Sequence, residues 1–131
     1  MKKILAIGLM SSLLGGCAGI MNLLPGHWDP NESAVITDAR YAAAHVDCKD
    51  PKRDLETIQQ KLDWLVLYTA SKGRDSNDVG KMLKPAKDSL DPLVERAQKG
   101  DINPLFCNLK MKIIREELEA VARGANARNM P

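Results

Sequence analysis

The chain has 131 residues, a length that suffices for one small domain with a single hydrophobic core. It contains 19 Lys and Arg residues and 17 Asp and Glu residues, which gives a formal net charge of +2. Positively and negatively charged side chains are interspersed along the chain, and each cluster of basic residues has acidic neighbours. This composition provides no basic surface for DNA or RNA, so nucleic-acid binding is excluded from the expected functions.

The first 16 residues have the three-part layout of a secretory signal peptide. Lys2 and Lys3 give a basic start, residues 4–14 form an uncharged apolar run, and two small residues precede Cys17. The apolar run is too short to span a bilayer, which requires about 20 residues. Removal of residues 1–16 would take away the two lysines, so the processed chain would carry no formal net charge.

The sequence Leu14-Gly15-Gly16-Cys17 resembles the lipobox of bacterial lipoproteins. In that family the cysteine is lipidated on its sulfur and the preceding peptide is removed. Gly15 departs mildly from the family, where Ala or Ser is commoner, and the alternative is an ordinary signal peptide with a chance cysteine. Ala18 stands where Asp would favour the inner membrane. The resemblance therefore implies a lipid anchor at Cys17 in the outer membrane, with the rest of the chain in the periplasm.

With Cys17 lipidated, Cys48 and Cys107 remain. Two cysteines of a small domain in an oxidising compartment are expected to form a disulfide, which would stabilise the fold by about 4 kcal/mol. A redox pair or a metal site is the alternative, but the chain has no Cys-x-x-Cys motif. His27 and His45 also lack the spacing of metal ligands. The sequence therefore predicts one disulfide, no metal and no cofactor.

Asp or Asn followed by Pro predicts the start of a helix, because the side chain accepts hydrogen bonds from free N–H groups and Pro suits the first helical position. Four such pairs occur: Asp29-Pro30, Asp50-Pro51, Asp91-Pro92 and Asn103-Pro104. Three glycines are expected to end helices: Gly73, Gly100 and Gly124. Since no segment shows the sustained alternation of a strand, the predicted class is all-α.

The apolar positions predict a bundle of about four helices that one disulfide cross-links. Helices are expected over residues 30–46, 51–72 and 104–123, and the third region is expected to break after Lys84 and to restart or kink at Asp91-Pro92. A bridge to Cys107, in the first turn of the last helix, would place the starts of the second and fourth helices side by side and parallel.

The chain therefore divides into four predicted segments. They are a signal peptide over residues 1–16, a lipidated N-terminus and tether over 17–29, a helical periplasmic domain over 30–124 and a disordered tail over 125–131. The tether is too apolar for a plain spacer, and we expect it to lie on the membrane surface near the anchor.

No catalytic motif occurs: the chain has no Gly-x-Ser-x-Gly, phosphate loop or His-Glu-x-x-His. His45 is expected to be a surface or capping residue, and the acidic run of Glu116, Glu117 and Glu119 a solvated helix face. We therefore expect no enzyme, no catalytic residue and a function that depends on binding.

Four apolar side chains are candidate contacts with a partner protein or with the membrane: Trp28, Trp64, Leu67 and Tyr68. Trp64 and Tyr68 lie one helical turn apart. Packing of these two rings in the core is favoured over exposure as an anchor for a partner.

Two families resemble the chain in different respects. The layout of four helices, an anchor and a long-range bridge between Cys48 and Cys107 is similar to that of the secretin pilotins, lipoproteins that carry secretin subunits to the outer membrane. Residues 23–28 and 64–73 resemble segments of small lipoproteins of large tailed phages. Some of these are the outer subunit of the spanin complex, which disrupts the outer membrane at lysis, and others act in superinfection exclusion. The chain departs from many outer spanin subunits, which are short and proline-rich.

These resemblances imply a lipid-anchored interaction protein of the outer membrane that faces the periplasm. Its expected partners are membrane lipid, through acylated Cys17, and an envelope or inner-membrane protein. A role in phage lysis or superinfection exclusion is favoured over a pilotin-like carrier. A structural envelope lipoprotein is the further alternative.

Overall fold

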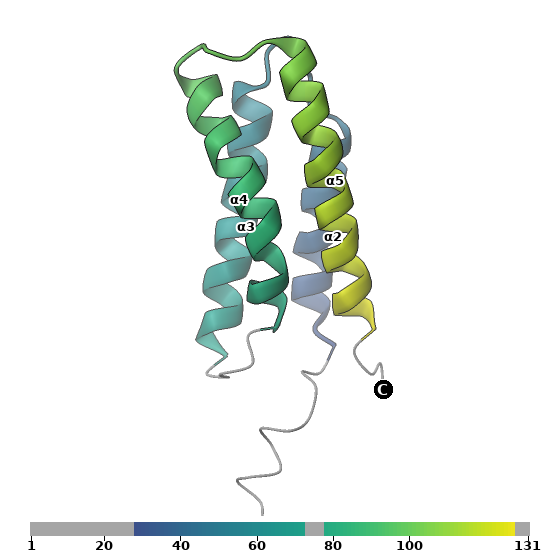
Figure 1. Ribbon diagram of the computed structural model, residues 1–131. Coiled ribbons are helices and arrows are strands. Elements are labelled where there is room, and N and C mark those ends of the chain that lie inside the picture. The colour runs from purple at the N-terminus through teal and green to yellow at the C-terminus, as the bar shows by residue number, and fades with distance from the viewer. Residues whose placement is uncertain (1–27, 73–77, 128–131) are drawn as a thin grey trace, which may run out of the picture.

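The computed structural model describes residues 28–72 and 78–127 (Figure 1). They form four helices, α2 (Pro30–Ala44), α3 (Lys52–Ser71), α4 (Asp78–Gln98) and α5 (Pro104–Asn126). Successive helices run in opposite directions, and each packs against two others: α2 and α4 both contact α3 and α5. The result is an up-down-up-down four-helix bundle, which confirms the predicted fold class. The signal peptide, Cys17, residues 18–27 of the tether, Gly73 and residues 128–131 lie outside the described residues.

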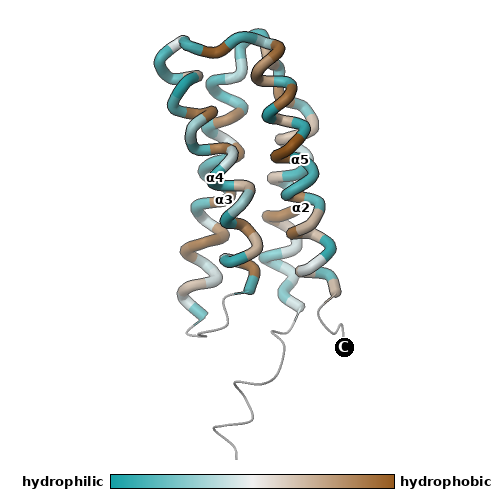
Figure 2. The backbone as a smooth tube through the Cα atoms, in the orientation of Figure 1, coloured by the Kyte–Doolittle hydropathy of each residue, from teal (hydrophilic) through white to brown (hydrophobic). Residues whose placement is uncertain are grey.

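The core consists of one apolar stripe from each helix. On α3 the buried positions recur at the three- and four-residue spacing of one helix face: Leu55, Ile58, Leu62, Leu65 and Thr69. Small residues, Ala39 and Ala43, line the buried face of α2, and larger ones fill the faces of α4 and α5. Figure 2 shows hydrophobic positions recurring between hydrophilic ones along each helix, as expected for helices that bury one face.

Two of the predicted helix starts are confirmed with their capping side chains. The Asp29 carboxylate accepts hydrogen bonds from the N–H groups of Asn31 and Glu32, at 2.8 and 3.3 Å. The Asn103 side chain accepts one from the N–H of Phe106, at 2.8 Å. The helix α3 begins as predicted after Asp50, but Pro51 occupies the capping position and no side chain caps this end.

The predicted break in the third region is wrong, because α4 is one continuous helix. Pro85 and Pro92 both lie inside it, and both are exposed. Neither proline can donate to the carbonyl four residues earlier, which belongs to Lys81 and to Asp88. These residues are exposed as well, so water can satisfy their carbonyls and the helix continues.

The predicted ends of the first and last helices also need correction. The helix α2 ends at Ala44, where the sequence predicts residue 46. The helix α5 continues to Asn126, and Ala125 is buried, so the predicted start of a disordered tail at residue 125 is too early. Gly124 does not end this helix. A Cβ atom there would overlap the end of the Met82 side chain of α4, so a larger residue would require that flexible side chain to move.

Gly100, in contrast, ends α4 as predicted. Its φ of 70° lies in the left-handed region that favours glycine. Its N–H donates to the carbonyl of Ala97 at 3.1 Å, and the N–H of Asp101 donates to the carbonyl of Arg96 at 2.9 Å. These two bonds form a Schellman motif, which satisfies the last carbonyls of the helix.

The predicted disulfide between Cys48 and Cys107 is confirmed, with the two Cα atoms 5.6 Å apart. Cys48 lies in the connection between α2 and α3, and Cys107 lies in the first turn of α5. The helices α3 and α5 are parallel, as predicted, but they occupy diagonal corners of the bundle and are not side by side. The disulfide can still form because Cys48 lies before α3 begins. The connection from α2 carries Cys48 near the start of α5 and then crosses the end of the bundle to α3.

Candidate interaction surface

Trp64, Leu67 and Tyr68 form an exposed patch on α3, which we call the aromatic surface. The exposed fractions of Trp64 and Leu67 are 43% and 72%, and Tyr68 is half-buried. The rings of Trp64 and Tyr68 are stacked, with centroids 4.6 Å apart and planes inclined by 11°. The favoured interpretation of these rings as core residues is wrong, because Leu65 and the residues at helical spacing from it form the buried face of α3.

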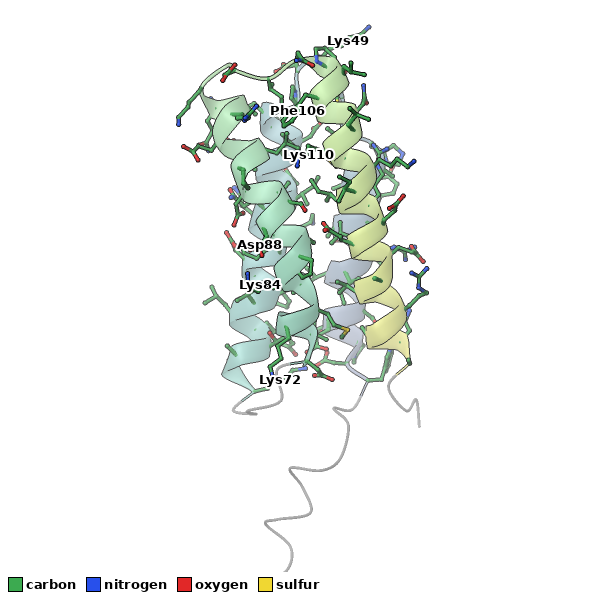
Figure 3. All side chains as sticks on the ribbon, viewed as in Figure 1. Lys49, Lys72, Lys84, Asp88, Phe106 and Lys110 are labelled. Carbon is green, nitrogen blue, oxygen red and sulfur yellow. A yellow bond between two sulfur atoms is a disulfide. The ribbon has the colours of Figure 1, made fainter. Side chains whose placement is uncertain are left out.

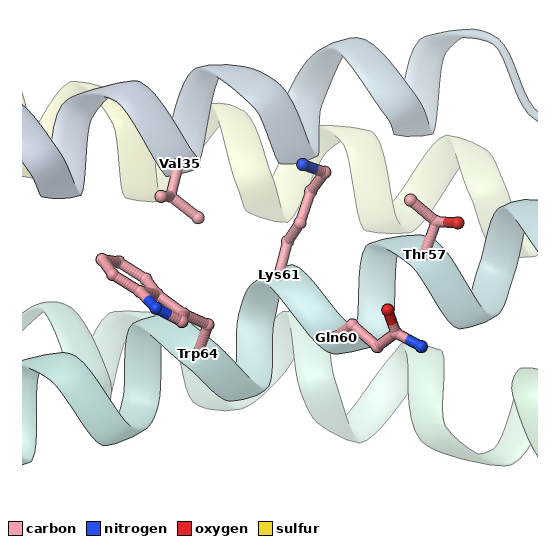
Figure 4. A pocket seen from close by; sticks show the side chains of 5 residues that line it. All are labelled: Val35, Thr57, Gln60, Lys61 and Trp64. Carbon is pink, nitrogen blue, oxygen red and sulfur yellow. The ribbon is translucent and has the colours of Figure 1, made fainter.

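A shallow groove of about 320 Å³ lies beside Trp64, between α2 and α3 (Figure 4). It is lined by Val35 of α2 and by four residues of α3: Thr57, Gln60, Lys61 and Trp64. The Lys61 ammonium lies 3.4 Å from the carboxylate of Asp38, so an ion pair spans the two helices at this level. The groove therefore extends the aromatic surface toward α2 as a recess with an apolar wall at Val35 and a charged edge.

A polar network holds the start of α2 against the end of α3. The Asp29 carboxylate accepts hydrogen bonds from Lys72 and from the Tyr68 hydroxyl, the latter at 3.1 Å. Lys72 also donates to the buried carboxylate of Glu32 at 2.6 Å, and its ammonium lies 4.8 Å from the centroid of the Tyr68 ring. Asn31 donates to the Tyr68 hydroxyl at 3.2 Å. One face of Tyr68 is thus packed on Trp64, and its hydroxyl is fixed at the point where the tether reaches the bundle.

The network favours the charged forms of its members. Burial raises the pKa of Asp29, but the hydrogen bonds from Lys72, from two backbone N–H groups and from Tyr68 outweigh burial and hold this pKa below its ordinary value. Burial likewise lowers the pKa of Lys72, but the carboxylates of Asp29 and Glu32 outweigh it and raise this pKa. Lys72 lies at the end of the bundle remote from Lys49 and Phe106 (Figure 3).

Trp28 lies at the same end of the bundle but is not part of the aromatic surface. Its indole N–H donates to the Ser33 hydroxyl at 3.0 Å, and that hydroxyl donates to the side chain of Asn126, on α5, at 3.3 Å. Within residues 28–72 and 78–127, no ring contact joins Trp28 to Trp64 or Tyr68. The structure therefore brings together three of the four predicted contact residues and places the fourth toward α5.

The other candidate polar residues have structural partners. His45 caps the end of α2, as predicted, and its ring Nδ1 lies 2.7 Å from the carbonyl of Tyr41. The prediction of a solvated acidic face is wrong for Glu117, which is half-buried with one carboxylate oxygen buried, whereas the Glu119 side chain remains partly exposed. Glu119 pairs with Arg40 of α2, and Glu117 accepts a hydrogen bond from Ser89 of α4 at 3.2 Å. These two carboxylates hold α5 to its neighbours.

Sequence reasoning missed a second exposed apolar feature, on α5. Leu105, Leu109 and Ile113 recur at a spacing of four, and we call them the α5 stripe. The signal was present, because this spacing places them on one helix face while Cys107 and Met111 belong to the buried one. The contribution of Lys72 was also missed, since its partners Asp29 and Glu32 are distant in sequence.

In the part of the chain that the structure describes, no three His, Cys, Asp or Glu side chains are grouped so that they could hold a metal ion. Nor does any helix in that part combine the length and the hydropathy that crossing a membrane requires. Comparison with known proteins finds no family model, no curated protein and no solved structure that matches the chain.

Proposed function

We propose that the chain is a lipid-anchored interaction protein without catalytic activity, held in the outer membrane at Cys17 with its bundle in the periplasm. The lipobox at residues 14–17 supports the anchor, and the Cys48–Cys107 disulfide fits an oxidising compartment. The observation that carries the proposal is the exposure of the aromatic surface near the end of the bundle where the tether arrives.

The length of the tether limits how far the aromatic surface can lie from the anchor. From Cys17 to Trp28 the chain can span at most about 40 Å when fully extended. Trp and Tyr combine an apolar ring with a polar group, so they suit both the membrane–water interface and the centre of a protein interface. The aromatic surface is therefore the proposed contact with the membrane or with an envelope partner.

For the specific role we retain phage lysis, as an outer spanin subunit, or superinfection exclusion. A pilotin-like carrier is the second candidate, and the bundle with its single long-range disulfide favours it. The two roles require different partners. A spanin subunit binds a coiled-coil protein of the inner membrane, whereas a pilotin binds a secretin subunit.

The anchor is tested by labelling cells with palmitate. The wild-type protein should incorporate the label and fractionate with the outer membrane, and Cys17→Ser should do neither. A Cys17→Ser protein that still carries the label and still fractionates with the outer membrane would contradict the anchor.

The contact surface is tested by crosslinking in envelopes with Trp64→Ala. Because Trp64 is exposed, this variant should stay folded, with a melting temperature close to that of the wild type, and should lose its crosslinked partner. Tyr41→Ala is the matched control, since Tyr41 is an exposed aromatic residue of α2 away from the aromatic surface. Retention of the partner by Trp64→Ala would remove this surface from the proposal. An enzymatic activity of the purified domain that does not depend on the anchor would refute the non-catalytic function.

A further inference from the structure

The α5 stripe is an apolar face that no other described element of the bundle covers. The exposed fractions of Leu105, Leu109 and Ile113 are 71%, 58% and 43%. At 1.5 Å per residue, the stripe extends over about 12 Å of the helix, or a little more than two turns. Scattered exposed leucines are common on proteins, but three in register along one face match the way in which one helix receives another.

Basic side chains flank the stripe on both sides. Lys112 is exposed beside Leu109 and Ile113, and Lys110 lies on the side of α5 that faces α4 (Figure 3). The Lys110 ammonium lies 5.8 Å from the centroid of the Phe106 ring, and the Arg96 guanidinium of α4 lies 4.7 Å from the same centroid. Neither Lys110 nor Lys112 has a carboxylate partner within residues 28–72 and 78–127. The stripe is therefore apolar along its centre and has a lysine on each flank, and the exposed Glu116 follows it on the same face of the helix.

These charges disfavour a second copy of this chain as the occupant. If two α5 helices met in parallel through the stripe, Lys112 on one flank would face the opposite flank of the partner, which carries Lys110. If they met antiparallel about Leu109, Lys110 would lie opposite Asn108 and Lys112 opposite Phe106. The parallel arrangement brings like charges together, and the antiparallel one places no carboxylate opposite either lysine.

We propose that the α5 stripe is the docking site for an amphipathic helix of another protein, whose own apolar stripe is flanked by Asp and Glu. Leucines of that helix pack between Leu105, Leu109 and Ile113, and its carboxylates pair with Lys110 and Lys112. The biological setting of this site rests on the proposed function. The α5 stripe starts at the end of the bundle remote from the tether, so an anchored domain presents it to the periplasm (Figure 1).

The probe is a fluorescent amphipathic peptide of about 15 residues, which a hydrocarbon staple holds helical because short helices are marginal in water. It has leucines at positions i, i+4 and i+8 with flanking glutamates, and a twin peptide has lysines in place of the glutamates. Binding to the full-length lipidated protein in detergent is followed by fluorescence anisotropy. We expect the glutamate peptide to bind and the lysine peptide to bind at least about 10-fold more weakly.

Two variants separate docking on the α5 stripe from nonspecific adhesion. Leu109→Ser should weaken the glutamate peptide by about 10-fold or more, since it removes the centre of the apolar contact. The double variant Lys110→Glu/Lys112→Glu should weaken the glutamate peptide and strengthen the lysine peptide. Leu67→Ser is the matched control, because Leu67 is also a largely exposed leucine but lies on the aromatic surface, and it should change neither affinity.

The proposal is overturned if Leu67→Ser and Leu109→Ser weaken binding equally, or if charge reversal leaves the peptide preference unchanged. It is also overturned if the wild-type protein dimerises and Leu109→Ser makes it monomeric, because the occupant would then be a second copy. Absence of palmitate labelling in the wild-type protein would refute the anchor without affecting peptide binding, so failures of the two proposals are distinguishable.

Discussion

The two ends of the bundle are held together by different kinds of interaction. At the end remote from the tether, a covalent bridge joins Cys48 to Cys107, and the Schellman motif at Gly100 closes α4. At the tether end, α2 and α3 are joined by the charged network of Asp29, Glu32 and Lys72. The disulfide at the first end does not titrate but depends on the redox state. The second depends on ionisation, so the two ends should fail under different conditions.

The largest expected effect comes from opening the covalent end. Reduction, or the double variant Cys48→Ala/Cys107→Ala, should lower the free energy of unfolding by about 4 kcal/mol, because the bridge restricts the unfolded chain. Urea unfolding of the oxidised and reduced protein measures the difference. A loss below about 1 kcal/mol would show that packing alone holds this end.

The next effect comes from removing a charge at the tether end. Glu32→Gln should destabilise the protein by about 1–3 kcal/mol, because it leaves the Lys72 ammonium without its buried carboxylate partner. Asp88→Asn is the control, since Asp88 pairs with Lys84 where both side chains are largely exposed, and it should cost about 0.5 kcal/mol or less. Urea midpoints give both values, and equal losses would contradict the importance of burial.

The pH dependence should separate the two ends. The folded pKa of Asp29 lies below its ordinary value of 3.8. Its contribution to stability is therefore complete above that value and is lost as the pH falls through the lowered pKa. Lys72 behaves in the opposite sense, because its folded pKa is raised. Its contribution to stability is complete below the ordinary pKa of 10.5 and is lost as the pH rises through the raised pKa.

Urea unfolding from neutral pH down to about pH 2 should show an acid-dependent loss in the wild type that is smaller in Asp29→Asn. The same measurement on Cys48→Ala/Cys107→Ala is the control. That variant should start from a lower stability and keep the full acid dependence. An unchanged acid slope in Asp29→Asn would assign the pH dependence to other carboxylates.

The smallest expected effect is at the turn after α4. Gly100→Ala should cost about 1 kcal/mol, because the backbone is left-handed there and no neighbouring atom obstructs a Cβ. Lys99→Ala is the control at an exposed neighbour and should change the stability by about 0.5 kcal/mol or less. Thermal unfolding of both variants distinguishes backbone strain from a general sensitivity of this connection.

The sequence predicted those features that local chemistry decides. The capping bonds of Asp29 and Asn103 involve residues two or three positions away, and the stripe of Leu62 and Leu65 follows from helical spacing alone. The disulfide followed from the number of cysteines. The disulfide prediction therefore did not depend on which helices are in contact. The predicted contact of α3 with α5, in contrast, is wrong.

The failures occurred where the outcome depends on which side of a helix meets solvent or a neighbour. Pro85 is tolerated inside α4 because it is exposed, and Gly124 lies inside α5, where it faces Met82 of α4. The sequence favours Trp64 as a core residue, but Leu65, the next residue, occupies the buried position. The surroundings of Pro85 and Gly124 depend on how the helices pack, whereas the spacing that buries Leu65 already argues for an exposed Trp64.

The hydrogen bond between Ser33 and Asn126 shows that the first turn of α2 and the last turn of α5 are neighbours. A short linker could therefore join these two ends, and new termini could be opened in the connection between Gln98 and Pro104. In such a circular permutant α5 would precede α2, while every helix would keep its neighbours. Because the entropy of loop closure changes only with the logarithm of loop length, the Cys48–Cys107 bridge would keep nearly all of its stabilising effect.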